Sequence, residues 1–217
     1  MNFKNLCIGV LGIHGSVEEH LESLRKCGMK TLRVKTKEDL EKIDGLILPG
    51  GESTTIGKLM NWYGLDKVLK DKIKKGLPVY GTCAGAILLA KKITGPQKAQ
   101  SLKLMDIETE RNAYGRQTDS FETEVDFVIP VETGILSLRV KDSCFRRNDK
   151  KVKKIPAIFI RAPRIKKIGK NVKILATFKN EPVLVQEKNM LAGTFHPELS
   201  DDLTVHKYFI DLCEKNL

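Results

Sequence analysis

The chain has 217 residues, 41% of them hydrophobic, which is enough for one domain with a sizeable core. No run approaches the roughly 20 apolar residues that a membrane-spanning helix needs, so we expect no such helix. The formal net charge of +11 raises nucleic-acid binding as a function, but residues 131–156 alone hold eight basic and three acidic side chains. Because only 6% of residues are aromatic, the stacking part of a nucleic-acid site is missing and we do not expect that function.

Cysteine usage and the N-terminus point to a reducing compartment. The five cysteines are scattered, and none forms a CxxC pair, which argues against a disulfide framework and against a zinc site. The apolar start of the chain is broken by glycines and carries no small-residue cleavage site, so it is typical of a first strand rather than a signal peptide. We therefore expect a cytoplasmic protein without a metal.

The first half of the chain alternates short apolar runs with helical patterns. Strands are expected at 7–12, 30–34, 44–51 and 78–82, and helices at 17–28, 53–62, 64–75 and 86–92. Strands that alternate with helices indicate βαβ units and a parallel sheet covered on both faces. In such α/β sheets, sites form in the loops beyond the carboxyl ends of the strands.

The second half changes character, because short strand-like runs follow one another with turn residues between them. These runs are 102–111, 120–127, 157–163, 172–178, 181–186 and 189–198. They indicate antiparallel additions to a mostly parallel core, and an amphipathic helix at 201–216 closes the chain. We expect one α/β domain over 1–217, with helices on both faces of a mostly parallel central sheet.

The stretch VYGTCAGA runs from a strand into a helix with Cys83 at the corner. This is the GxCxG form of a nucleophile elbow, in which Gly81 and Gly85 leave room for a sharp, strained turn. A cysteine at a helix start is favoured as the thiolate, and the N–H of Ala84 is placed to stabilise an oxyanion. The alternative is a buried cysteine in a tight turn whose glycines serve packing alone.

A nucleophilic thiol needs a base, and four histidines are available. His196 ends an apolar strand, and Glu198, two residues later, can hydrogen-bond its imidazole and fix the tautomer. On its own HPE could equally be a plain turn. His14 follows the first strand and could face the same site, whereas His20 and His206 lie in helical patterns and are expected at surface or boundary positions.

The stretch LPGGEST closes the third strand with a loop of little side-chain bulk. Its N–H groups can approach a substrate closely, and Gly51 can offer a second oxyanion donor. A glycine turn capped by Ser53 at a helix start would explain the same residues, and the two interpretations are compatible.

Taken together and in this order, PGGEST, GTCAGA and HPE resemble a class I, triad-type glutamine amidotransferase, which implies a flavodoxin-like α/β fold. More closely, LGIHGSVEEH, LPGGESTTI, RNAYGRQTDSFE, FIRAP and AGTFHPELSDD resemble the glutaminase subunits of pyridoxal 5′-phosphate synthases. The resemblance covers nearly the whole chain except residues 128–153. RNAYGRQ and FIRAP are more specific than the triad, which many amidotransferases share.

The resemblance implies roles for individual residues and no cofactor. Cys83 attacks the side-chain amide of L-glutamine, His196 moves the proton, Glu198 orients His196, and Gly51 and Ala84 form the oxyanion hole. The implied substrate contacts are Gly51, Glu52, Ser53, Arg111, Ile160 and Arg161. An arginine fork matches the α-carboxylate of the substrate, although surface ion pairs would also explain both arginines.

The resemblance also implies a partner, since free ammonia would be lost to solution. Members of this family pass it to a synthase subunit, a (β/α)₈ barrel, within a hetero-oligomer. Two alternatives stay open: an amidotransferase subunit serving another synthase, and a catalytically impaired interaction subunit.

Residues 128–153 depart from the family pattern as a basic insertion just before Ile160 and Arg161. The text CFRRND resembles a translated bacterial palindromic repeat, which favours a neutral insertion in a surface hairpin. The competing interpretation is a basic patch for a partner or nucleic acid, and either could disturb the substrate contacts that follow.

Overall fold

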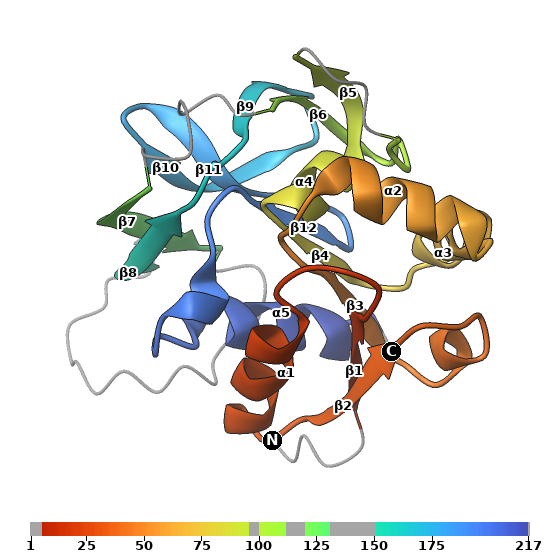
Figure 1. Ribbon diagram of the computed structural model, residues 1–217. Coiled ribbons are helices and arrows are strands. Elements are labelled where there is room, and N and C mark those ends of the chain that lie inside the picture. The colour runs from red at the N-terminus through yellow and green to blue at the C-terminus, as the bar shows by residue number, and fades with distance from the viewer. Residues whose placement is uncertain (1–5, 96–99, 112–119, 131–150, 217) are drawn as a thin grey trace.

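A nine-stranded mixed sheet forms the centre of the fold (Figure 1), in the computed structural model of the chain, which describes residues 6–95, 100–111, 120–130 and 151–216. Five neighbouring strands run parallel, in the order β2 (Lys30–Val34), β1 (Cys7–Leu11), β3 (Gly45–Leu48), β4 (Val79–Thr82) and β12 (Met190–Gly193). Antiparallel pairing then adds β11 (Glu181–Glu187), β10 (Lys173–Phe178), β7 (Phe121–Ile129) and β8 (Lys151–Phe159). The predicted α/β fold with antiparallel additions is confirmed.

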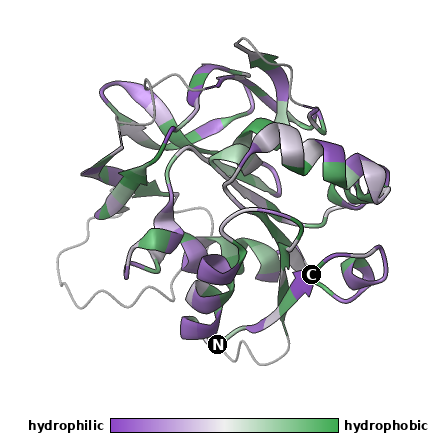
Figure 2. Cartoon of the chain, viewed as in Figure 1, coloured by the Kyte–Doolittle hydropathy of each residue, from purple (hydrophilic) through white to green (hydrophobic). Residues whose placement is uncertain are grey.

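Helices cover both faces of the parallel strands. One face packs against α1 (Val17–Lys26) and α5 (Thr204–Glu214), and the other against α2 (Ser53–Trp62), α3 (Leu65–Lys74) and α4 (Ala84–Leu89). Strand β3 shows why: Ile47 belongs to the first core, while Leu46 and Leu48 belong to the second. Because successive side chains of a strand point to opposite faces, a strand that is apolar throughout can fill both cores. Figure 2 shows the outer surface of α1 as largely hydrophilic, as expected of a helix that buries one stripe.

Strand β12 belongs to the parallel part of the sheet, although it follows the antiparallel strands in the sequence. The prediction placed residues 189–198 among the antiparallel additions, but β12 pairs in parallel with β4, with Gly193 opposite Thr82. The residues that follow these two strands therefore lie at the same edge of the sheet. Strand order depends on long-range pairing, which the local pattern of β12 does not encode.

A second, three-stranded sheet consists of β5 (Ala90–Thr94), β6 (Met105–Glu110) and β9 (Arg164–Ile168). The prediction that the helix after the elbow runs to residue 92 is wrong, because α4 ends at Leu89 and the next residues pair with β6. Pairing with β6, reinforced by Lys92 and Glu108 (Nζ to Oε2, 3.0 Å), outweighs the helix preference of the alanine–lysine stretch. The sequence analysis missed β9, whose RIKKI pattern is too basic to stand out as a strand.

The hairpin of β7 and β8 contains both flanks of the proposed insertion. Ile129 lies opposite Lys151 in the register, so residues 151–153 belong to a paired strand rather than to an inserted loop. Residues 131–150 lie outside the described part of the chain. Strand β8 also ends at Phe159, four residues before the end of the expected strand at 157–163.

Within the described ranges, no helix is long and apolar enough to cross a membrane; the longest of them, α5, has 11 residues.

Candidate functional site

Cys83 sits at the sharp turn between β4 and α4. Its backbone has φ 48° and ψ −101°, a conformation that non-glycine residues rarely adopt. The flanking glycines make this turn possible: a Cβ at Gly81 would lie 2.5 Å from the Gly85 carbonyl carbon, and one at Gly85 would lie 2.0 Å from the Leu48 oxygen. The strand–elbow–helix arrangement expected from GTCAG is therefore present, with Cys83 only 7% exposed.

His196 and Glu198 follow β12 and form a buried hydrogen-bonded pair. His196 Nδ1 lies 2.7 Å from Glu198 Oε1, and the His196 backbone N–H donates to the Ile158 carbonyl at 2.8 Å. The Ser16 hydroxyl also donates to Glu198 Oε1, at 2.8 Å. Because Nδ1 is engaged by the carboxylate, Nε2 is the ring nitrogen left for a reacting group.

Parallel pairing of β4 with β12 brings the imidazole to the cysteine. A Cβ added at Gly50 would lie 2.4 Å from His196 Cε1 and 3.5 Å from Cys83 Cβ, so both side chains border the space beside this glycine. The three residues proposed as the triad are thus assembled from two neighbouring strand ends. The arrangement matches the nucleophile, base and orienting group of a triad.

The electrostatics of this pair favour a protonated imidazole beside an ionised carboxylate. Burial lowers the pKa of His196, but the interactions with Cys83 and Glu198 outweigh it and raise that pKa to about 10. Burial raises the pKa of Glu198, but His20 and His196 outweigh it and lower that pKa to about 2. A proton taken from the Cys83 thiol would therefore stay on His196 at neutral pH.

The loop after β3 forms a second wall beside Cys83. The Ser16 N–H donates to the Gly50 carbonyl at 3.2 Å, which fixes the orientation of the peptide that links Gly50 to Gly51. Gly51 has φ +149°, and a Cβ at Gly15 would lie 1.8 Å from the Gly50 oxygen, so the two loops require glycine where they meet. The backbone of Gly51 is thereby held close to the elbow.

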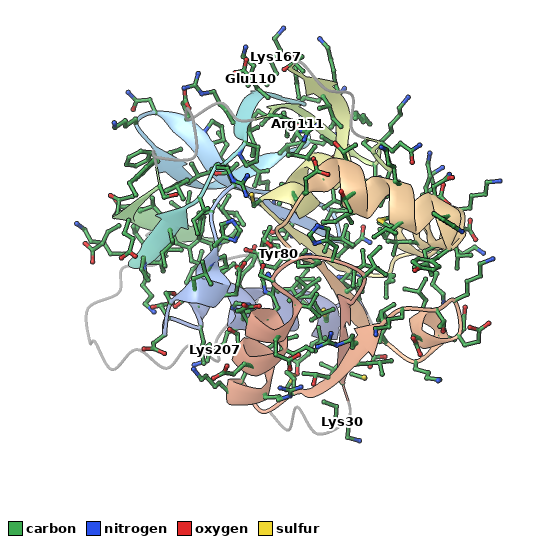
Figure 3. All side chains as sticks on the ribbon, viewed as in Figure 1. Lys30, Tyr80, Glu110, Arg111, Lys167 and Lys207 are labelled. Atoms are coloured by element: carbon green, nitrogen blue, oxygen red, sulfur yellow. The ribbon has the colours of Figure 1, made fainter. Side chains whose placement is uncertain are left out.

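Glu52 and Arg111 are hydrogen-bonded to each other in one wall of the site. The Glu52 carboxylate caps α2 by accepting from the N–H groups of Thr54 (3.0 Å) and Thr55 (2.6 Å). Arg111 at the end of β6 donates to Glu52 Oε1 at 3.0 Å and to the Thr54 hydroxyl at 3.0 Å. Burial raises the pKa of Glu52, but the bonds from Thr55 and Thr54 outweigh it and lower that pKa to about 2. Figure 3 shows Arg111 where the three-stranded sheet approaches α2.

Ile160 and Arg161 approach the cysteine from the end of β8. The Ile160 carbonyl oxygen lies 3.9 Å from Cys83 Sγ, and Arg161 has φ 45°, a second strained backbone at this site. Ile160 and Arg161 therefore line the same cavity as Cys83.

These walls enclose a cavity of about 460 Å³. It is lined by Ser16, Gly50, Gly51, Glu52, Ser53, Cys83, Ala84, Ile87, Arg111, Ile160, Arg161, His196 and Leu199. Every residue to which the sequence analysis assigned a catalytic, oxyanion or substrate-binding role lines the cavity except Glu198, which lies behind His196 and bonds to it. The sequence analysis missed Ser16, whose position just after β1, at the carboxyl edge of the sheet, could have suggested it.

The other three histidines differ from expectation. His14 is exposed and does not line this cavity. The expectation that His20 and His206 occupy surface or boundary positions is wrong, because both are 0% exposed. Helical periodicity alone did not reveal that α1 and α5 pack these side chains inward. Among the described residues, no group of three or more His, Cys, Asp or Glu side chains is arranged to hold a metal ion.

Comparison with known proteins identifies relatives over almost the whole chain. The profile of the SNO glutamine amidotransferase family matches residues 10–215. The chain is 52% identical over 207 residues to the pyridoxal 5′-phosphate synthase subunit PdxT of Thermotoga sp. (strain RQ2), covering 95% of this chain and 99% of the relative. It is 46% identical over 208 residues to PdxT of Dictyoglomus turgidum, covering 96% and 99%. A crystal structure of a glutamine amidotransferase, 38% identical, superposes with a TM-score of 0.81 over 95% of this chain and 98% of that one.

Proposed function

The chain belongs to the SNO glutamine amidotransferase family, and on this premise we propose that it is the glutaminase subunit of a pyridoxal 5′-phosphate synthase. It hydrolyses the side-chain amide of L-glutamine to L-glutamate and ammonia. One observation carries the proposal: Cys83 stands at a nucleophile elbow beside the hydrogen-bonded His196–Glu198 pair, in a chain similar over nearly its whole length to PdxT subunits.

The chemistry follows the triad logic with cysteine as the nucleophile. The Cys83 sulfur, having lost its proton to His196, attacks the amide carbon and forms a carbon–sulfur bond. His196 returns that proton to the leaving nitrogen as the carbon–nitrogen bond breaks, releasing ammonia and leaving a thioester. Water then attacks the thioester with His196 as base, and glutamate leaves with the thiol restored. Glu198 stabilises the imidazolium through its bond to Nδ1.

The negative oxygen that forms in both steps needs donors, and backbone N–H groups supply them. We assign these to Ala84, which follows the nucleophile, and Gly51, whose loop lies against the elbow. Losing one such donor costs about 10²–10³ in kcat in other enzymes, so both loops must hold their geometry.

Substrate recognition is assigned to the far side of the cavity. Arg111 presents a guanidinium suited to the α-carboxylate of glutamine, and its hydrogen bonds to Glu52 and Thr54 fix its direction. The Glu52 carboxylate is engaged by α2 and Arg111, so we assign it to holding Arg111 in place as well as to lining the cavity. Ser53, Ile160 and Arg161 complete the wall around the substrate.

The proposed partner is the synthase subunit that uses the ammonia. The relatives are named as subunits of pyridoxal 5′-phosphate synthase, which supports a hetero-oligomer and argues against an amidotransferase serving another synthase. We also propose that the protein acts in the cytoplasm, and the described cysteines, which are all free thiols, support a reducing location.

The test is glutamate release from glutamine, measured with and without the synthase subunit of the same organism. We expect turnover that rises with the partner and disappears in Cys83→Ala. Cys27→Ala is the matched control, because burial raises the pKa of the Cys27 thiol to about 11 and keeps it unreactive. Turnover that does not change when the synthase subunit is added would indicate a different synthase partner. If the wild type releases no glutamate, the protein is a catalytically impaired interaction subunit.

A further inference from the structure

Buried polar side chains continue from Glu198 away from the cavity, through His20 to His206. His20 Nε2, on α1, lies 3.4 Å from Glu198 Oε2 and 3.0 Å from the Thr82 hydroxyl oxygen on β4. His20 Nδ1 lies 3.0 Å from His206 Nε2 on α5. This line of side chains thus runs from Cys83 and His196 through Glu198 to two histidines that the proposed reaction does not use. Figure 1 shows α1 beside α5, where this line ends.

Both histidines are fully enclosed, and burial favours the neutral form of each ring. His20 and His206 are 0% exposed. Burial lowers the pKa of His20, and it lowers the pKa of His206 to about 3. A neutral imidazole carries one N–H, so each ring donates through one nitrogen and accepts through the other.

Two observations select the same tautomer for both rings. Among the described residues, His206 Nδ1 has no hydrogen-bond partner, and a buried acceptor without a partner costs less than a buried donor without one. The proton of His206 therefore lies on Nε2, which donates to His20 Nδ1. His20 must then carry its own proton on Nε2, the nitrogen that faces Glu198 Oε2. The opposite assignment would point a lone pair at a carboxylate oxygen.

This tautomer places an N–H donor close to the second carboxylate oxygen of Glu198. Glu198 Oε1 is served by His196 and Ser16, but Oε2 has no hydrogen-bond partner among the described residues, and His20 Nε2 stands 3.4 Å away. The Tyr80 hydroxyl on β4 is buried on the same side, and Figure 3 shows Tyr80 near the centre of the molecule. A buried carboxylate in this setting needs an oriented dipole at Oε2 to stay ionised and in one rotamer.

We propose that His20, its tautomer fixed by His206, is a positioning residue that keeps the Glu198 carboxylate ionised and aimed at His196. The inference rests on the proposed glutaminase function, because it assigns a role within the same triad. The groups that face Glu198 are His196 from its own loop, Ser16 and His20 from the start and body of α1, and Tyr80 from β4. His20 Nε2 lies 3.4 Å from Oε2 and 3.0 Å from the Thr82 hydroxyl oxygen, so replacing His20 changes the surroundings of Oε2 directly.

Two amide substitutions of His20 separate the two ends of its ring. The amide of glutamine reaches about as far as Nε2 of histidine, whereas that of asparagine reaches only as far as Nδ1. His20→Gln therefore keeps a donor toward Glu198, and His20→Asn keeps only the group that faces His206. Both variants remove the ring, so a merely structural role would affect them alike. Leu24→Ala, one turn further along α1 and also 0% exposed, controls for damage to the core.

Turnover by the full-length protein with its synthase subunit is the first readout. We expect His20→Asn to lower kcat by about 10- to 100-fold and to leave KM unchanged. Loss of the hydrogen-bond partner that orients a metal-ligating histidine has an effect of this size in other proteins. His20→Gln should stay within a few-fold of the wild type. The acid limb of the kcat profile should move to higher pH in His20→Asn, because Glu198 without its donor is protonated more easily. Equal losses in both variants, or a kcat loss in Leu24→Ala equal to that in His20→Asn, would overturn the proposal.

Alkylation of Cys83 by iodoacetamide, followed by mass spectrometry across pH, is a readout that does not need turnover. A weaker Glu198 charge destabilises the imidazolium of His196, so alkylation of Cys83 in His20→Asn should require a higher pH than in wild type. If the wild type lacks glutaminase activity but this shift occurs, the proposed function fails and the positioning role stands. If the wild type is active and the alkylation profiles of both variants match it, the positioning role fails alone.

Discussion

At the scale of single residues, the site depends on a backbone that the surrounding structure holds in strain. Cys83 adopts φ 48°, and its N–H donates to the Gly193 carbonyl at 2.8 Å, which ties the elbow to β12. Residues in sparsely populated conformations cost about 1–3 kcal/mol and persist only when their neighbours enforce them. The tie to β12 also keeps Cys83 in register with the histidine that follows that strand.

The ionisation of Glu198 gives a prediction for the dependence of stability on pH. Its pKa is lowered from 4.5 to about 2, so its contribution to stability is present above pH 4.5 and is lost as the pH falls through about 2. We expect Glu198→Gln to be less stable than the wild type at pH 6 by a free energy of unfolding on the order of 3 kcal/mol. The difference should shrink steadily below pH 4.5. Urea denaturation between pH 2 and 7 measures it, with exposed Glu22→Gln as control; a difference that stays constant with pH would contradict the assignment.

At the scale of elements, the start of α2 and the end of β6 are coupled through one carboxylate. Glu52 caps α2 and accepts a hydrogen bond from Arg111, which lies just past β6. A capping residue therefore also sets the direction of the guanidinium proposed to hold substrate. The wall of the cavity formed by these two elements should respond as a unit.

Substituting Glu52 by alanine tests this coupling. Loss of the cap should lower the free energy of unfolding by about 1 kcal/mol, and loss of the Arg111 partner should raise KM for glutamine while kcat changes little. Thermal unfolding and steady-state kinetics measure the two effects. Glu41→Ala is the control, since Glu41 pairs with Lys72 at the surface and does not line the cavity. A normal KM in Glu52→Ala would mean that Arg111 keeps its direction without the carboxylate.

At the scale of the whole molecule, two cores on opposite faces of one sheet leave its carboxyl edge free for chemistry. The loops after β1, β3, β4 and β12 supply Ser16, Gly51, Cys83 and His196 to a single cavity. This agrees with the general position of sites in open α/β sheets. In the antiparallel part of the sheet, the residues that follow β8 lie beside Cys83.

The basic insertion is the part of the molecule that we expect to be dispensable. Because Ile129 and Lys151 face each other in the β7–β8 register, residues 130–150 can be replaced by a two-residue Asn-Gly turn. We expect a melting temperature within about 2 °C of the wild type and unchanged glutamate release with the synthase subunit. Calorimetry and the coupled assay measure these quantities. Loss of the activation by the partner alone would instead identify the segment as a docking surface.

Local features of this protein were readable from its sequence. The elbow could be found because a strained turn demands small residues at fixed spacing, and GTCAG states that demand within five positions. The alternation of strands and helices in the first half followed from apolar periodicity, and the spacing of His196 and Glu198 predicted a pair that the structure shows at 2.7 Å. Each of these signals depends on neighbours in the chain.

Tertiary structure alone decided the rest. The place of β12 beside β4 depends on pairing between strands more than 100 residues apart, which no local pattern specifies. The burial of His20 and His206 depends on how α1 and α5 pack. Because both helices also carry many polar side chains, the sequence pattern predicted surface positions for these histidines. Ser16 reached the site only because β1 ends at the same edge as β4. The sequence by itself determined which residues could do chemistry, and packing between distant segments determined which of them meet.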